Sequence, residues 1–118
     1  HNAIRAGMTK NLIAKGKKYY TFAYKPRDMI LDHGKGAIMW DLEGKNYVDF
    51  GAGIAVSALG HHKKELIAAL TDQAEKLWHT SNMFYTEPVV RLAEELVKAS
   101  KFAKRVFFTN SGGEANEA

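Results

Sequence analysis

The stretch Phe107-Phe108-Thr109-Asn110-Ser111-Gly112-Gly113-Glu114-Ala115-Asn116-Glu117-Ala118 carries the strongest fold signal in this sequence. Together with Val106, its first two residues form a β-branched and aromatic run that predicts a short buried strand. The small residues then break the strand, and residues 114–118 favour a helix with acidic residues in its first turn. A strand, a glycine-rich turn and a helix start leave backbone N–H groups free, which suits a phosphate group. The same pattern is also typical of an ordinary strand-to-helix turn capped by Ser or Asn.

Three further segments lie upstream of this stretch, and all four occur in an order known from one family. The segments are residues 40–50, residues 53–61, residues 77–82 with Phe84, Tyr85, Glu87 and Pro88 after them, and residues 110–118. Their patterns, WDxxGxxYxDF, GIAVxxLGH, LWHxSN and NSGxEANEA, resemble those of the class-III, pyridoxal-phosphate-dependent aminotransferases. The LWHxSN segment is similar to that of acetylornithine and succinylornithine aminotransferases in particular. The resemblance covers the chain from about residue 20 onward and implies the amino-terminal part of a protein several times longer.

The resemblance implies an α/β protein of fold type I among the transferases that use pyridoxal phosphate. Residues 1–60 would supply an amino-terminal helix and the antiparallel strands of a small domain. Residues 61–118 would supply a linking helix and then the first strand and helix of a large domain with a mostly parallel sheet.

The residue pattern itself predicts local elements that fit this order. Apolar spacing favours helices over residues 63–77 and 88–99, and residues 8–18 are interpreted as a polar or weakly amphipathic opening helix. Short extended runs are predicted at 28–31, 37–40 and 46–50, with turns at His33–Gly36 and Leu42–Lys45. Gly44 supplies the positive φ that a tight turn needs. Residues 1–7, which precede Met8, are set aside as a candidate cloning remnant.

Composition is that of a soluble globular protein and indicates neither a membrane nor a nucleic-acid partner. Of the 118 residues, 46% are hydrophobic and 25% are charged. No run approaches the roughly 18 apolar residues of a membrane span, and no signal peptide is visible. The absence of cysteine excludes disulfides and thiolate metal sites and permits a reducing compartment. The net charge of +4 includes a cluster at Lys15, Lys17 and Lys18, which favours a solvated face over a nucleic-acid patch.

The resemblance places the cofactor's phosphate on the backbone amides of Gly112 and Gly113, with Ser111 as the side-chain donor beside them. Relatives usually have a larger residue at the second position of this pair, so Gly113 keeps the amide but loosens the turn. Glu114 would repel a phosphate that it faced, and its side chain is therefore expected to point outward.

Two substrate-binding residues also come from the resemblance. Tyr24 stands where ornithine-type members have a tyrosine near the substrate carboxylate, although a tyrosine packed in a loop is the alternative. Ile54 stands where ornithine δ-aminotransferases have a tyrosine that recognises the free α-amino group. An apolar side chain there fits an acylated ornithine better, and a simple core isoleucine is the alternative. A loop containing Ser81, Asn82, Phe84 and Tyr85 would lie near a dimer interface and the active-site entrance.

No catalytic residue and no metal ligand is predicted within the 118 residues. The Schiff-base lysine, the aspartate that pairs with the pyridine nitrogen and the arginine that binds the substrate carboxylate would all lie beyond residue 118. Lys101 and Lys104 are interpreted as solvated. His33, His61, His62 and His79 match no zinc spacing. The chain departs from the family pattern GHxHP at Gly60–Lys64, where a proline and a second histidine are missing.

The resemblance implies an aminotransferase of arginine metabolism that moves the δ-amino group of N-acetylornithine or succinylornithine to 2-oxoglutarate. It would use pyridoxal phosphate and work as a cytoplasmic homodimer. Ornithine or 4-aminobutyrate is the alternative amino donor. A further alternative is a catalytically incomplete fragment that acts only as a folding or dimerisation module.

Overall fold

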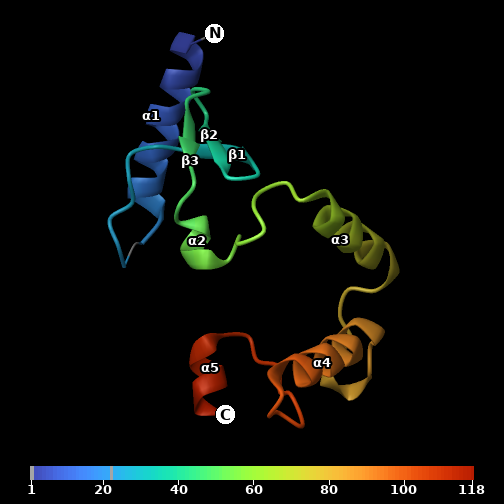
Figure 1. The fold of residues 1–118 in the computed structure, drawn as a ribbon. Coiled ribbons are helices and arrows are strands. Elements are labelled where there is room, and N and C mark those ends of the chain that lie inside the picture. Colours follow the sequence, from blue (N-terminus) through green and yellow to red (C-terminus); the bar gives the residue numbers. More distant parts are fainter. Residues whose placement is uncertain (1, 22) are drawn as a thin grey trace. The chain divides into compact units, whose positions relative to one another are not determined.

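The computed structural model describes residues 2–21 and 23–118. The elements in chain order are α1 (Asn2–Tyr19), β1 (Leu31–Lys35), β2 (Ile38–Asp41), β3 (Asn46–Val48), α2 (Ala52–Ala55), α3 (Lys64–Lys76), the 3-10 turn η1 (Ser81–Met83), α4 (Glu87–Ser100) and α5 (Gly112–Glu117) (Figure 1). They form two units, one ending at Leu77 and the other starting at Trp78. The assignment of residues 1–60 and 61–118 to a small and a large domain stays a prediction.

The three strands form one antiparallel sheet in the order β1-β2-β3. The turn predicted between β2 and β3 is confirmed, and Gly44 adopts a φ of +87°, which costs glycine little. Asp41 at the end of β2 holds this turn, because its Oδ1 accepts the amide protons of Glu43 and Lys45 at 2.9 Å each. A carboxylate that closes the turn in this way fixes how the two strands pair.

β1 is where the strand prediction was wrong. The predicted turn at His33–Gly36 is instead strand as far as Lys35, and the chain reverses around Ala37. Gly34 belongs to the strand because it pairs with Met39 of β2. The ring of His61 packs against it, and an added Cβ would lie 2.6 Å from His61 Cγ. The predicted runs at 28–31 and 46–50 contribute only Leu31 and residues 46–48 to strands.

Helices α3 and α4 agree closely with the predicted spans. α3 begins at Lys64, which stands where the family pattern has proline, and no side chain caps its start. α4 contains Pro88 in its first turn, as expected for a helix start. Ion pairs one turn apart, such as Lys76–Asp72 at 2.6 Å and Lys98–Glu94 at 2.7 Å, lie on the solvated faces of the two helices.

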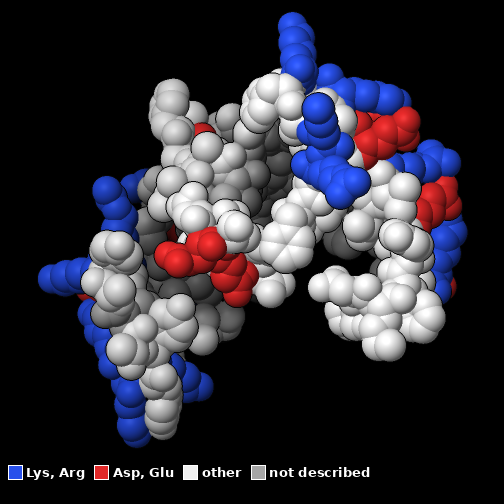
Figure 2. Space-filling view, turned by 90° about the horizontal axis from the view of Figure 1, so that it is seen from below, with Lys and Arg blue, Asp and Glu red and all other residues white. Residues whose placement is uncertain are grey.

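The amino-terminal helix is longer than predicted. α1 begins at Asn2, so residues that had been set aside as a candidate remnant are helical. Within the basic cluster, Lys17 forms an ion pair with Asp28 at 2.9 Å. In Figure 2, Lys and Arg side chains project from the surface in several separate places and on part of it alternate with Asp and Glu. Among the described helices, none is both long and apolar enough to cross a membrane.

The predicted strand at residues 106–108 has no regular secondary structure and no strand pairing. A strand exists only through hydrogen bonds to a neighbouring strand, and none of the described residues supplies a partner to this one. The apolar faces of the helices are also uncovered: no hydrophobic side chain among the described residues is buried, and Leu70 of α3 is 72% exposed. The helices therefore have apolar faces that no other part of the described segment covers.

Candidate functional site

The turn from Asn110 to Glu114 is closed by two reciprocal hydrogen bonds. Ser111 is the N-cap of α5, and its Oγ accepts the amide proton of Glu114 at 3.2 Å. The carboxylate of Glu114 reaches back and accepts the amide proton of Asn110 at 2.8 Å. The arrangement resembles a capping box, except that the carboxylate of Glu114 binds the amide of Asn110, the residue before the N-cap, instead of the N-cap amide itself.

The side chain of Glu114 is exposed, and its carboxylate is bound to the amide of Asn110, the residue before the N-cap. The negative charge is thereby tied to Asn110. That the side chain points away from a bound phosphate stays a prediction. The turn keeps the Ser cap that the ordinary reading of the sequence also predicted.

Two consecutive amides in this turn are available to a ligand. The N–H groups of Gly112 and Gly113 donate no hydrogen bond to any described residue. A Cβ added to Gly112 would meet no atom within 4 Å, and one added to Gly113 would lie 3.7 Å from Ser111 Oγ. Neither glycine has a positive φ, so the backbone alone does not demand glycine at these positions. The space and the free donors fit a phosphate group.

Ile54 lies in α2, in the unit that ends at Leu77, and the backbone of this short turn has an unusual conformation. The φ values of Ala52, Gly53, Ile54 and Ala55 are all positive, between 45° and 64°. The left-handed region costs an L-residue roughly 1–2 kcal/mol, and it is especially unfavourable for a β-branched side chain. The side chain of Ile54 is 96% exposed, so it is not a core residue of the described segment. Strain of this kind persists only where surrounding contacts hold it.

Asp49 supplies contacts on the amino-terminal side of this turn. Its Oδ1 accepts the amide protons of Ala52 at 2.8 Å and Gly51 at 3.1 Å. Its Oδ2 lies 2.8 Å from Nε2 of His61, a distance at which a ring N–H donates to a carboxylate. The hydrogen bond from His61, followed by the one from the Ala52 amide, holds the pKa of Asp49 below its ordinary value. Sequence reasoning missed this role, although Asp49 belongs to the WDxxGxxYxDF segment.

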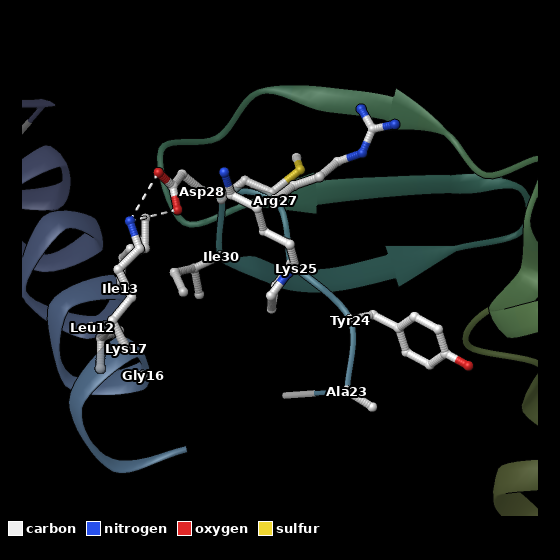
Figure 3. A pocket seen from close by; sticks show the side chains of 12 residues that line it. Leu12, Ile13, Gly16, Lys17, Ala23, Tyr24, Lys25, Arg27, Asp28 and Ile30 are labelled. Atoms are coloured by element: carbon white, nitrogen blue, oxygen red, sulfur yellow. Dashed lines mark hydrogen bonds and ion pairs between the residues drawn. The ribbon is translucent and has the colours of Figure 1, made fainter. Parts of the chain in front are cut away.

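Tyr24 lines a cavity of about 510 Å³ between α1 and the chain leading into β1 (Figure 3). Leu12, Ile13 and Ile30 give this cavity apolar walls, and the Lys17–Asp28 ion pair lies beside it. In Figure 3 the ring of Tyr24 is turned away from α1. The side chain is largely exposed, and its hydroxyl has no hydrogen-bond partner among the described residues. A tyrosine packed into its own loop is therefore not what the structure shows.

The aromatic loop before α4 is held by local polar contacts. Nε2 of His79 accepts the amide proton of Ser81 at 3.2 Å, and Oγ of Ser81 accepts that of Met83 at 3.3 Å. Phe84 and Tyr85 are exposed. Nothing in residues 2–21 and 23–118 gathers three metal-binding side chains into one group.

Comparison with known proteins identifies the family to which this chain belongs. The model of the class-III aminotransferases matches residues 19–118. The chain belongs to this family. Acetylornithine aminotransferase of Xanthomonas campestris pv. campestris is 57% identical over 100 residues, which are 85% of this chain and 24% of that protein. Succinylornithine transaminase of Yersinia enterocolitica is 55% identical over 95 residues, covering 80% of this chain and 23% of that protein.

A solved class-III relative has the same fold over this segment. The crystal structure of N-acetylornithine aminotransferase from Stenotrophomonas maltophilia matches with a TM-score of 0.79 and 54% sequence identity, over 89% of this chain and 27% of that one. The fold-type expectation for a class-III aminotransferase is thus confirmed over the segment. The chain spans about a quarter of the length of the curated relatives that it matches.

Proposed function

We propose that the chain is the amino-terminal part of a pyridoxal-phosphate-dependent aminotransferase that moves the δ-amino group of N-acetylornithine or succinylornithine to 2-oxoglutarate. The turn at Asn110–Glu114, found in a chain that belongs to the class-III aminotransferases, is the observation that carries the proposal. It combines two free backbone amides, a hydroxyl and open space. These groups are what a phosphate monoester needs.

Within this proposal the phosphate is bound by Ser111, Gly112 and Gly113. The two glycine amides donate to phosphate oxygens, and the absence of side chains allows them to approach. The hydroxyl of Ser111 already accepts a hydrogen bond from the Glu114 amide, and its own proton stays available to donate. Pyridoxal phosphate, once bound, supplies the electron sink for the amine chemistry.

Tyr24 and Ile54 are proposed to bind the substrate. The exposed hydroxyl of Tyr24 suits a substrate carboxylate, which accepts hydrogen bonds. The exposed side chain of Ile54 offers no hydrogen bond, so it accommodates a neutral acylated nitrogen and leaves a free ammonium group unsatisfied. The names of both curated relatives, which act on acylated ornithines, support this assignment. We place the enzyme in the cytoplasm as a homodimer.

The test uses a protein of the relatives' full length that carries this segment. Purified protein with pyridoxal phosphate receives 2-oxoglutarate and either N-acetylornithine, succinylornithine, ornithine or 4-aminobutyrate, and glutamate formation is measured. We expect kcat/KM to be highest for an acylated ornithine. A higher kcat/KM for ornithine or 4-aminobutyrate would assign the protein to the alternative amino donor.

The uncovered apolar faces favour one other role, that of a folding or dimerisation module without catalysis. Spectroscopy separates the two roles. A cofactor-binding protein changes the absorbance of added pyridoxal phosphate and retains it through gel filtration. A protein that acts only as a module leaves both unchanged.

A further inference from the structure

The turn of residues 52–55, which is α2, must be stabilised by contacts from outside it, because three of its four residues are not glycine and still have positive φ. Its backbone hydrogen bonds are local: Ala55 donates to the carbonyl of Gly51 at 3.1 Å, and the amides of Ser57, at 2.8 Å, and Val56 both donate to the carbonyl of Ala52. These bonds close the turn but do not fix its orientation. The direction in which Ile54 points depends on what anchors the turn's first residues.

The carboxylate of Asp49 provides that anchor. Its Oδ1 holds the amides of Gly51 and Ala52 at the entry to the turn. Its other oxygen is held by His61, twelve residues further along the chain. The side chain of Asp49 is only 9% exposed and that of His61 29%, so water competes poorly for this contact. The pair therefore clamps both ends of the segment that contains Ile54.

The clamp is itself tied to the sheet. The amide of His61 donates to the carbonyl of Gly36 at 2.8 Å, and the amide of Gly36 donates to the carbonyl of His61 at 2.9 Å. The amide of Asp49 donates to the carbonyl of Ala37 at 2.8 Å. A continuous series of hydrogen bonds thus connects the β1–β2 reversal to the left-handed turn.

We propose that Asp49 is a positioning residue for substrate choice: it acts through the left-handed turn to hold Ile54 against the acylated end of the substrate. The inference rests on the proposed function, since it assumes that Ile54 meets the substrate. While Ile54 is held in place, a free ammonium group beside it loses water without gaining a partner. When the turn relaxes, water returns to that position. Discrimination against ornithine then falls.

The experiment measures kcat and KM for N-acetylornithine and for ornithine in the full-length holoenzyme. Asp49→Ala removes every contact of the carboxylate. We expect it to lower the ratio of kcat/KM for N-acetylornithine over ornithine about tenfold, mainly through a higher KM for N-acetylornithine. Asp49→Asn keeps an oxygen that accepts the two amide protons, so it should restore most of the ratio, to within about threefold of the parent.

Asp32→Asn is the matched control. Asp32 faces His33 at 2.8 Å in an exposed Asp–His pair on β1, and this pair does not involve the turn. This variant should keep the parental ratio. His61→Ala serves as the second variant in case Asp49→Ala does not fold. It leaves the amide contacts of Asp49 in place and should lower the ratio about threefold.

The outcomes separate the inference from the function on which it rests. If the parent protein transfers the amino group from neither N-acetylornithine nor succinylornithine, the proposed function fails. If the parent prefers N-acetylornithine and the folded Asp49 and His61 variants keep its ratio, or lose kcat equally for both substrates, Asp49 has only a structural role and the inference fails. A fall in the ratio with Asp32→Asn as large as with Asp49→Ala also overturns it.

Discussion

The hydroxyl of Tyr47 on β3 donates a hydrogen bond to Oδ2 of Asp41 at the end of β2, across 2.7 Å. Asp41 therefore has two roles: Oδ2 binds Tyr47, and Oδ1 closes the turn between these strands. The hydrogen bond from Tyr47 is the main cause that lowers the pKa of Asp41. The hydrogen bond to Asp41 is in turn the main cause that raises the pKa of Tyr47.

These shifts predict how the pair responds to pH. The pKa of Tyr47 is raised above its ordinary value of 10.0, so the stabilisation is complete below that pH and is lost as the pH rises through the raised pKa. The pKa of Asp41 is lowered from 3.8, so the stabilisation is present above that pH and is lost as the pH falls through the lowered pKa. We therefore expect the contribution of the Tyr47–Asp41 hydrogen bond to stability to be constant between pH 3.8 and pH 10.0.

Alkaline absorbance titration of the tyrosines checks this prediction. Tyr47→Phe should remove a tyrosine that ionises above pH 10.0, and Asp41→Asn should move that ionisation back toward the ordinary value. If Tyr47→Phe leaves the ionisation above pH 10.0 in place, or Asp41→Asn does not move it, the pair is not formed in solution.

The sequence predicted those parts of the structure that depend on neighbours along the chain. The spacing of Leu66, Ile67 and Leu70 was enough for α3, and Gly44 was enough for the turn after β2. The N-cap role of Ser111 also follows from local pattern, because the acceptor and the donor are three residues apart.

Features that depend on distant residues were missed or mistaken. Gly34 was assigned to a turn, but it lies in β1. A side chain is excluded there because the ring of His61, which is distant in sequence, packs against it. The positive φ of Ile54 contradicts its intrinsic preference and becomes intelligible only when the contacts of Asp49 are known. The residues 106–108 have the composition of a strand but lack a partner among the described strands.

Substitution of Ile54 gives a direct test of its proposed contact with the substrate. In the full-length protein Ile54→Tyr adds a hydroxyl that can bind a free α-amino group, so preference should shift toward unacylated ornithine. Single groups in such pockets discriminate by about 1–3 kcal/mol, and we expect a shift of about tenfold in the kcat/KM ratio rather than a complete switch. Val56→Tyr is a control two residues away, at a side chain that is also largely exposed. An unchanged ratio in Ile54→Tyr would leave Ile54 without a role in substrate choice.

The 118-residue chain by itself should not behave as a stable monomer. No hydrophobic side chain among the described residues is buried, and helices of 13 or 14 residues such as α3 and α4 are marginal without packing. We expect association in gel filtration and no cooperative thermal transition by circular dichroism. Leu70→Gln should reduce the association, whereas Glu75→Gln on the same helix should not. A monodisperse monomer with a cooperative transition would contradict this prediction.

The phosphate turn gives the last prediction, which concerns Gly112 and Ser111 in the full-length protein. Because Gly112 does not have a positive φ and a Cβ there meets no described atom, Gly112→Val should not disturb the turn itself. A bound phosphate would change this, since the added side chain would occupy the space in front of the free amides. Ser111→Ala should weaken pyridoxal phosphate binding by about 1.5–3 kcal/mol, the worth of one hydrogen bond to a charged group. Gly112→Val should weaken it further.

Two measurements decide whether the loss arises at the phosphate. The Kd for pyridoxal phosphate should rise in the order parent, Ser111→Ala, Gly112→Val, while far-ultraviolet circular dichroism stays near that of the parent. Gly7→Val in α1 is the matched control, because a Cβ at Gly7 also meets nothing within 4 Å and the position is remote in sequence from the turn. Its Kd should equal that of the parent. If all three variants bind pyridoxal phosphate as the parent does, the phosphate does not lie on the amides of Gly112 and Gly113.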